Sequence, residues 1–192
     1  MTRSIDFRLY LITDRSILTY GHILADAVEE SLKGGVRAVQ LREKDLGIRQ
    51  LLDMAYCLRE ITNRHNAKLF INDRVDVALA VNADGVHLGV NGMPAHAARK
   101  AAGKNMMIGA SAHSIEEAKR AQDEGADFLT LGPIYETPSK KEYGKPLGLE
   151  ILKKTAGEIS VPVFAIGGIK IEKVEGVLQA GAYGVALISA VL

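Results

Sequence analysis

The chain has 192 residues, of which 47% are hydrophobic and 24% charged, and its formal net charge is +1. This length predicts one domain over residues 1–192, and the near-zero charge argues against nucleic acid or an anionic membrane surface as a partner. No apolar stretch approaches the roughly 18 residues of a membrane span, and residues 1–6 lack a signal-peptide pattern. We therefore expect a soluble, cytoplasmic protein, and a homo-oligomer remains open.

Short apolar runs alternate with amphipathic segments along the whole chain. Helical periodicity covers, among others, residues 23–33, 48–65 and 114–124, and Ser114 with Glu117 has the pattern of a capping box. The predicted strands are residues 9–13, 38–42, 69–72, 85–88, 107–111, 128–131, 163–166 and 184–187. Alternating strands and helices indicate a parallel sheet, and eight strands favour a closed (β/α)8 TIM barrel over an open doubly wound sheet. The eighth helix is expected to be short or missing.

The single cysteine, Cys57, excludes an internal disulfide and fits a reducing compartment. Because Cys57 falls in the apolar run 51–58, we predict a buried small hydrophobic side chain rather than a nucleophile.

Polar side chains follow the predicted strands, where the loops of a parallel barrel converge on its active site. Alternation along the second strand places Gln40, Arg42 and Lys44 on one side. Two cations and an amide suit an anionic group such as a diphosphate. The alternative is a salt-bridge layer inside the barrel, with Glu43 as the partner.

Asp73 follows the third predicted strand and precedes a helix. Aspartate is a favoured helix N-cap and also a ligand for hard cations, so Asp73 is predicted to be an N-cap, a metal ligand, or both by turns.

Two later loops favour a phosphate site. Gly167 and Gly168 follow the seventh strand and Ser189 follows the eighth, where backbone N–H groups can approach an oxyanion. The aperiodic segment from residue 132 to about 148 has the length of a mobile loop over an active site, and its Thr137, Ser139 and Lys140 are candidate anion contacts.

The five histidines show no metal-ligand spacing. Structural roles are predicted for His22, His65, His96 and His87. His113, two residues beyond Ser111, is the histidine that we consider for acid–base work.

Seven segments, read in order, are LYLITD, GGVRAVQLREK, FINDRVDVALAVNADGVHLG, IGASAHSIEEA, GADFLTLGPIYETPSK, VPVFAIGGI and AGAYGVALIS. Together they closely resemble the thiamine-phosphate synthase family over nearly the whole chain. The resemblance implies a barrel that joins hydroxymethylpyrimidine diphosphate to a thiazole phosphate, with Mg²⁺ as cofactor and diphosphate as the leaving group.

The resemblance also implies roles for individual residues. Asp73 would be a Mg²⁺ ligand, and Ser111 would lie beside the reacting methylene group. The diphosphate would be held by Gln40, Arg42 and Lys44, assisted by Asn72 and Lys140. The thiazole phosphate would be surrounded by Thr137, Ser139, Gly168, Ile188 and Ser189.

One position departs from the family pattern. After the motif HLG the family has a second metal-binding aspartate, and this chain has Gly92 there. Loss of an anionic oxygen should weaken Mg²⁺ binding, although Asn91, water or the diphosphate can compensate. The departure keeps open two alternatives: a metal-independent thiazole tautomerase and a non-catalytic binder of phosphorylated thiamine precursors. The residues suited to diphosphate favour the synthase.

Overall fold

In the computed structural model, which describes residues 4–18, 23–137 and 145–188, eight parallel strands close into one barrel. Each strand pairs with the next in chain order, and β1 closes the ring on β8, with Leu9 opposite Val185. The strands are β1 (Leu9–Ile12), β2 (Ala38–Leu41), β3 (Lys68–Asn72), β4 (Gly85–Leu88), β5 (Met107–Ala112), β6 (Phe128–Leu131), β7 (Val163–Ile166) and β8 (Gly184–Leu187). The predicted barrel is confirmed.

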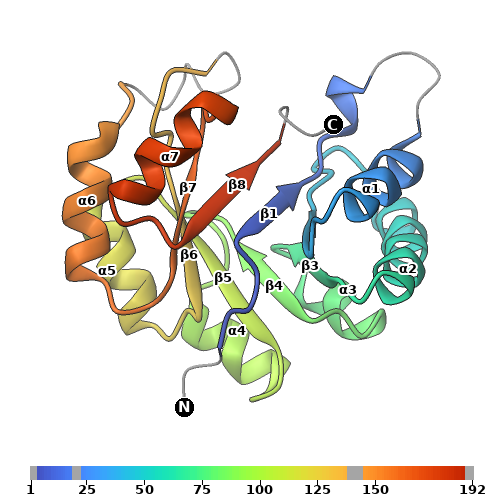
Figure 1. Cartoon of the computed structure of the whole chain (residues 1–192). Helices are drawn as coiled ribbons and strands as arrows, with labels where there is room; N and C mark the ends of the chain where they lie inside the picture. The colour runs from blue at the N-terminus through green and yellow to red at the C-terminus, as the bar shows by residue number, and fades with distance from the viewer. Residues whose placement is uncertain (1–3, 19–22, 138–144, 189–192) are drawn as a thin grey trace.

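Helices follow the strands and cover the outside of the barrel (Figure 1). They are η1 (Arg15–Ile17), α1 (Leu24–Lys33), α2 (Ile48–Arg64), α3 (Val75–Ala80), α4 (Ala95–Ala102), α5 (Ile115–Asp123), α6 (Gly148–Glu158) and α7 (Ile171–Gln179). The described residues end at Ile188, and within them no helix follows β8. None of the described helices combines the length and apolar content needed to cross a membrane.

Strand alternation divides the apolar side chains into two cores. Outward residues of the strands, such as Val39 and Leu129, pack beneath the helices in one continuous cluster. Inward residues form a second cluster inside the barrel, in which Phe70, Phe128 and Phe164 surround the axis. A TIM barrel is filled by layers of inward side chains in this way, so it is a packed core and not a pore.

The amino-terminal end of the barrel is closed by Phe7. Its ring lies 5.3 Å from that of Phe164 and 5.7 Å from those of Phe70 and Phe128, within the range of favourable aromatic pairs. At the same end of the barrel, two ion pairs of 2.6 Å tie outer helices to the residues just before strands. They join Arg59 of α2 to Asp84 and Arg99 of α4 to Asp127. A ligand must therefore enter from the carboxyl ends of the strands.

Two local predictions need correction. Cys57 is exposed. The buried residues of α2, including Ala55 and Leu58, lie on the face of the helix that packs on the barrel, and Cys57 does not lie on that face. The capping box is only half formed: the Ser114 hydroxyl accepts the Glu117 N–H, but the Glu117 carboxylate accepts the N–H of His113.

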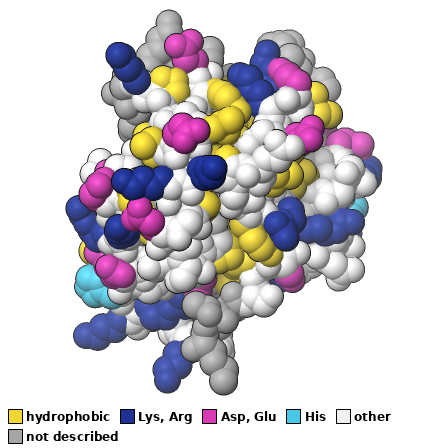
Figure 2. All heavy atoms as spheres, turned by 60° about the vertical axis from the view of Figure 1, so that its left-hand side comes forward, with side chains coloured by type: hydrophobic (Ala, Val, Ile, Leu, Met, Phe, Trp, Pro, Cys, Tyr) yellow, Lys and Arg dark blue, Asp and Glu magenta, His cyan; other side chains and the backbone are white. Residues whose placement is uncertain are grey.

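The helical face that comes forward in Figure 2 carries lysine and arginine side chains interspersed with acidic ones. Lys119 of α5 pairs with Glu158 of α6 at 2.6 Å on the surface. Such exposed pairs contribute little to stability.

Candidate active site

The carboxyl mouth of the barrel holds a cavity of about 370 Å³. Its polar lining comes from the ends of β2 to β6 and the loops that follow them. The polar lining residues are Gln40, Arg42, Lys44, Asn72, Asp73, His87, Asn91, Ser111, His113 and Thr130. Ile12, Ile166 and Ile188 add an apolar side, so the cavity can accept a molecule with both a charged and a ring portion.

The end of β2 places its polar residues as strand alternation predicts. Gln40, Arg42 and Lys44 all line the cavity, whereas the Glu43 carboxylate points elsewhere and accepts the backbone N–H of Arg15 at 3.1 Å. The hypothesis of an interior salt-bridge layer through Glu43 is therefore wrong, because Glu43 pairs with Arg15 of η1. Burial raises the pKa of Glu43, and the hydrogen bonds from Thr13 and Arg15 oppose that rise.

Asp73 lies just beyond β3 in a left-handed conformation with φ of 58°, which aspartate tolerates better than most residues. Its carboxylate accepts the Gly89 N–H at 2.7 Å and the Asn72 side-chain amide at 2.9 Å. The N-cap interpretation is wrong: Arg74 precedes α3, and the helix start has no side-chain cap. Asp73 is instead fixed at the mouth of the barrel by the loop after β4.

Gly92 belongs to that loop and faces Asp73. A Cβ atom at Gly92 would lie 2.6 Å from Asp73 Oδ1 and 3.0 Å from the Gly89 carbonyl oxygen. Any side chain here would therefore displace the Asp73 carboxylate. Gly92, the position at which the chain departs from the family pattern, thus lies against Asp73, the predicted metal ligand.

The residues at the mouth offer a limited set of donors for a cation. Asp73 is the only acidic side chain among the described residues that line the cavity, and no group of three acidic, histidine or cysteine side chains suitable for a metal occurs in residues 4–18, 23–137 and 145–188. Mg²⁺ commonly takes one or two carboxylates, several waters and substrate phosphates. Asp73, with amide oxygens nearby, fits an ion that is bound together with a diphosphate.

The cavity floor contains contacts that the sequence prediction missed. Ser111 Oγ lies 3.1 Å from His87 Nε2, and His87 Nδ1 lies 3.4 Å from the Tyr10 hydroxyl. The Tyr10 hydroxyl accepts the Gln40 amide at 3.1 Å. A sequence signal existed, because Tyr10, Gln40, His87 and Ser111 all occupy inward positions of predicted strands. His113 lies beside this floor, with its Nδ1 atom 3.5 Å from Glu117.

The predicted phosphate loops are only partly described. Ile188 lines the cavity, whereas Thr137 and Gly168 are not among its lining residues; Ser139, Lys140 and Ser189 lie outside the described residues. Gly168 has φ of 65°, and a Cβ there would lie 2.4 Å from the Glu136 carbonyl oxygen. The loop after β7 therefore packs closely on the segment that contains Thr137, and glycine is required at this contact.

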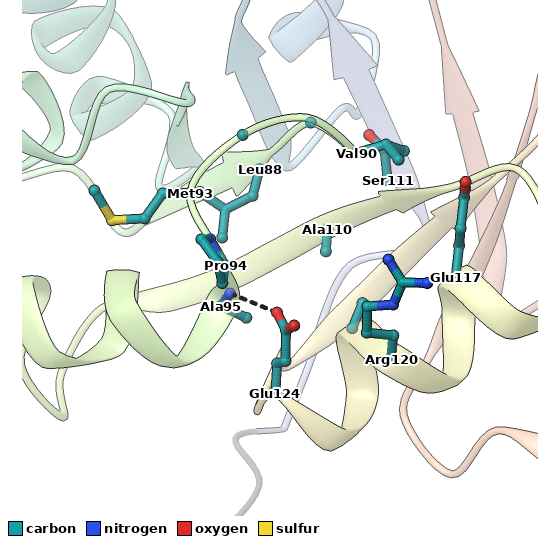
Figure 3. Close-up of a pocket in the computed structure, with 13 residues that line it drawn as sticks. Leu88, Val90, Met93, Pro94, Ala95, Ala110, Ser111, Glu117, Arg120 and Glu124 are labelled. Atoms are coloured by element: carbon teal, nitrogen blue, oxygen red, sulfur yellow. Dashed lines mark hydrogen bonds between the residues drawn. The ribbon is translucent and has the colours of Figure 1, made fainter.

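A second, smaller hollow of about 160 Å³ lies outside the mouth, between the loop after β4 and α5 (Figure 3). Glu117 and Arg120 project from α5 beside it, and Glu124 accepts the N–H of Ala95 at 3.1 Å. Ser111 and Gly92 border both spaces. This hollow therefore adjoins the loop that holds Asp73.

Comparison with known proteins identifies the family. The family model for thiamine monophosphate synthase matches residues 9–191. A Geobacter sulfurreducens protein named "Putative thiamine-phosphate synthase" is 55% identical over 98% of this chain and 88% of its own length. The thiamine-phosphate synthase of Clostridium novyi is 46% identical over 98% of this chain and 92% of its own.

A solved structure gives the same result. Thiamine phosphate pyrophosphorylase from Pyrococcus furiosus superposes with a TM-score of 0.86 at 41% identity, covering 96% of this chain and 86% of that one. These relatives support the synthase and neither of the two alternatives. The chain belongs to the thiamine monophosphate synthase family.

Proposed function

We propose that this transferase joins hydroxymethylpyrimidine diphosphate to a thiazole phosphate with the help of Mg²⁺, at the carboxyl mouth of the barrel. The observation that carries the proposed site is the convergence of Arg42, Lys44, Asp73 and Ser111 on one cavity. Cations, a carboxylate and a hydroxyl around one cavity match the needs of a leaving diphosphate, and family membership supports the reaction.

In the proposed reaction the methylene–oxygen bond breaks and diphosphate leaves with the electron pair. The thiazole nitrogen supplies the pair for the new carbon–nitrogen bond. The electron-rich pyrimidine ring supports positive charge on the methylene carbon. The protein therefore has to neutralise the leaving group and align the two rings, which requires no strong base.

Each described side chain then has a role. Arg42 and Lys44 bind diphosphate oxygens, Asn72 supports them, and Asp73 would hold Mg²⁺, which when bound neutralises charge on the leaving group. Ser111 donates its hydroxyl beside the breaking bond, and His113 is the group at the mouth that can exchange a proton. Ile188, Thr137 and Gly168 would contact the thiazole phosphate. The family pattern adds Ser139 and Ser189 to that phosphate and Lys140 to the diphosphate, and these three residues lie outside the described ranges.

The direct test measures diphosphate release against Mg²⁺ concentration with both substrates, and with each substrate omitted. We expect product only when both substrates and the metal are present. Arg42→Gln should lower turnover at least about 10-fold, since it removes a charge-assisted contact to the leaving group. Arg64→Gln, at the far end of α2, is the matched control and should retain full activity. Isomerisation of a thiazole without metal would instead establish a tautomerase.

The compartment is a separate expectation. We propose that the enzyme works in the cytoplasm, where phosphorylated precursors are retained, and fractionation of the native cells followed by the same assay checks this.

A further inference from the structure

Below the cavity, five polar side chains on five different strands form one chain of contacts. Gln40 Nε2 lies 3.1 Å from the Tyr10 hydroxyl, which lies 3.4 Å from His87 Nδ1. His87 Nε2 in turn lies 3.1 Å from Ser111 Oγ and 3.3 Å from Thr130 Oγ1. Gln40, His87, Ser111 and Thr130 all line the cavity. Tyr10, Gln40, His87 and Thr130 are at most 3% exposed, whereas Ser111 is half-buried, so Ser111 is the member of this chain most open to a ligand.

The direction of the hydrogen bonds follows from which atoms can donate. The Gln40 amide nitrogen can only donate, so the Tyr10 oxygen accepts and its own proton is available for His87 Nδ1. Burial raises the pKa of Tyr10 well above its usual value, against a smaller lowering by Gln40, and the phenol therefore remains a donor. An imidazole that accepts at Nδ1 carries its hydrogen on Nε2 when neutral.

The ring of His87 has little freedom to turn away from this arrangement. A Cβ atom at Gly109 would lie 2.5 Å from His87 Nδ1, so the neighbouring strand leaves space for the ring only because residue 109 is glycine. The Phe128 ring closes another side, with its centroid 5.7 Å from that of His87. Packing and hydrogen bonding thus fix the same orientation.

We infer that His87 is a positioning residue for the reaction: Tyr10 holds it as the Nε2–H tautomer, and it donates to Ser111 Oγ so that the Ser111 hydrogen is directed into the cavity. The Thr130 hydroxyl, 3.4 Å from Ser111 Oγ, is a second donor to the same oxygen. A serine that accepts two hydrogen bonds from below becomes a stronger and better aligned donor toward a ligand above. This inference rests on the proposed role of Ser111.

The first experiment tests the tautomer without relying on activity. In protein labelled with ¹⁵N-histidine, the His87 shifts should show hydrogen on Nε2 and an unprotonated, hydrogen-bonded Nδ1. Tyr10→Phe removes the donor to Nδ1 and should move the Nδ1 shift toward that of an imidazole nitrogen without a hydrogen bond. Hydrogen on Nδ1 in the unmodified protein would overturn the inference.

The second experiment is a double-mutant cycle between His87 and Ser111. Ser111→Ala should lower kcat about 100-fold, as loss of one preorganised donor does, and His87→Leu about 10-fold. In the Ser111→Ala background, His87→Leu should change kcat by less than about 2-fold, because the group on which it acts is gone. His87→Gln, which can return an N–H near the position of Nε2, should recover most of the loss.

The outcomes separate the inference from the proposed function. If Ser111→Ala leaves kcat unchanged, the proposed role of Ser111 fails, and the positioning role of His87 fails with it. A different result is that Ser111→Ala lowers kcat and His87→Leu lowers it by the same further factor in the Ser111→Ala background as in the unmodified protein. In that case the reaction site stands and only the inference about His87 is overturned. Thermal unfolding of each variant confirms that the compared proteins are folded.

Discussion

The lower and upper layers of the barrel interior show two ways of filling the same space. The lower layer is aromatic: Phe7 and Phe128 contact each other, and each also contacts Phe70 and Phe164, at centroid distances of 5.3–5.7 Å. The upper layer is polar, and its buried side chains are joined by hydrogen bonds in a chain that leads to Ser111. The lower layer seals and stabilises the barrel, and the upper layer keeps donors in place at the cavity.

The difference has a physical reason. Burying an aromatic ring is favourable wherever packing is complete, whereas burying a hydroxyl or an imidazole costs free energy unless each polar atom has a partner. The polar layer is therefore expected to contribute less to stability than the aromatic layer. What the polar layer provides is a fixed geometry, because its hydrogen bonds hold each side chain in one orientation.

The largest expected effect is on stability, in the lower layer. Phe128→Ala removes a fully buried ring that contacts four other aromatic residues, among them Phe7, Tyr10 and Phe164, and should destabilise the fold by about 3–5 kcal/mol. Urea unfolding measures this change. Thr130→Val, two residues along the same strand, is the matched upper-layer variant. It should cost at most about 1.5 kcal/mol, because it replaces one hydroxyl at nearly constant volume.

Activity should reverse that order. The folded fraction of Phe128→Ala should retain more of the wild-type kcat than Thr130→Val. Phe128→Ala removes packing beside His87 but no hydrogen bond, whereas Thr130 contacts Ser111 directly. Equal losses of stability and activity in both variants would contradict the division of labour between the layers.

The next effect concerns the metal at the upper rim. Asp73→Asn keeps the size of the side chain but removes its charge, so the Mg²⁺ concentration for half-maximal rate should rise at least about 10-fold. Asp76→Asn is the matched control, because Asp76 is exposed at the start of α3 and pairs with Arg74. Calorimetric titration of Mg²⁺ in the presence of inorganic diphosphate gives a measurement independent of turnover. Equal Mg²⁺ dependence in the two variants would remove Asp73 from the site.

Gly92 permits a finer test of the same rim. Gly92→Ala forces the Asp73 carboxylate to move without supplying a ligand, and should weaken Mg²⁺ about 3- to 10-fold. Gly92→Asp causes the same displacement but adds a carboxylate, so it should bind Mg²⁺ about 10-fold more tightly than Gly92→Ala. The comparison between the two variants separates charge from crowding. If they bind Mg²⁺ equally, residue 92 does not face the ion.

Sequence patterns predicted the barrel almost completely, because alternation and periodicity depend on local burial. Four strands, beginning with Gly85–Leu88, have the predicted bounds, and the other four differ by one residue at one end. The inward direction of Gln40 and Arg42 followed from the same alternation.

Contacts between strands could not be predicted in this way. Whether Asp73 caps its helix or accepts the Gly89 N–H depends on a loop sixteen residues away, and the partner of Glu43 is set by the packing of η1. His87 was assigned a structural role because a lone histidine on a strand gives no signal of its neighbours. Register places it between Tyr10 and Ser111, and sequence spacing alone does not reveal that register.

The smallest expected effect concerns Glu43. This residue stands between Arg42 and Lys44 in the sequence but, unlike them, does not line the cavity. Burial raises its pKa above the ordinary value of 4.5, so the folded state binds more protons than the unfolded state as the pH rises above 4.5. The stability that this proton contributes is therefore fully present below pH 4.5 and is lost as the pH rises through the higher, folded-state pKa.

Glu43→Gln should remove that dependence. Relative to the variant, the unmodified protein should lose unfolding free energy as the pH rises from about 4.5 through the raised pKa of Glu43. The Mg²⁺ dependence of the reaction should stay unchanged, because Glu43 faces Arg15 and not the cavity. Urea unfolding at several pH values measures the difference, and Glu172→Gln, exposed in the first turn of α7, is the control. An unfolding free energy that rises with pH relative to Glu43→Gln would mean that the Arg15 contact outweighs burial. Glu43 would then hold β1 to β2 chiefly as an ion pair.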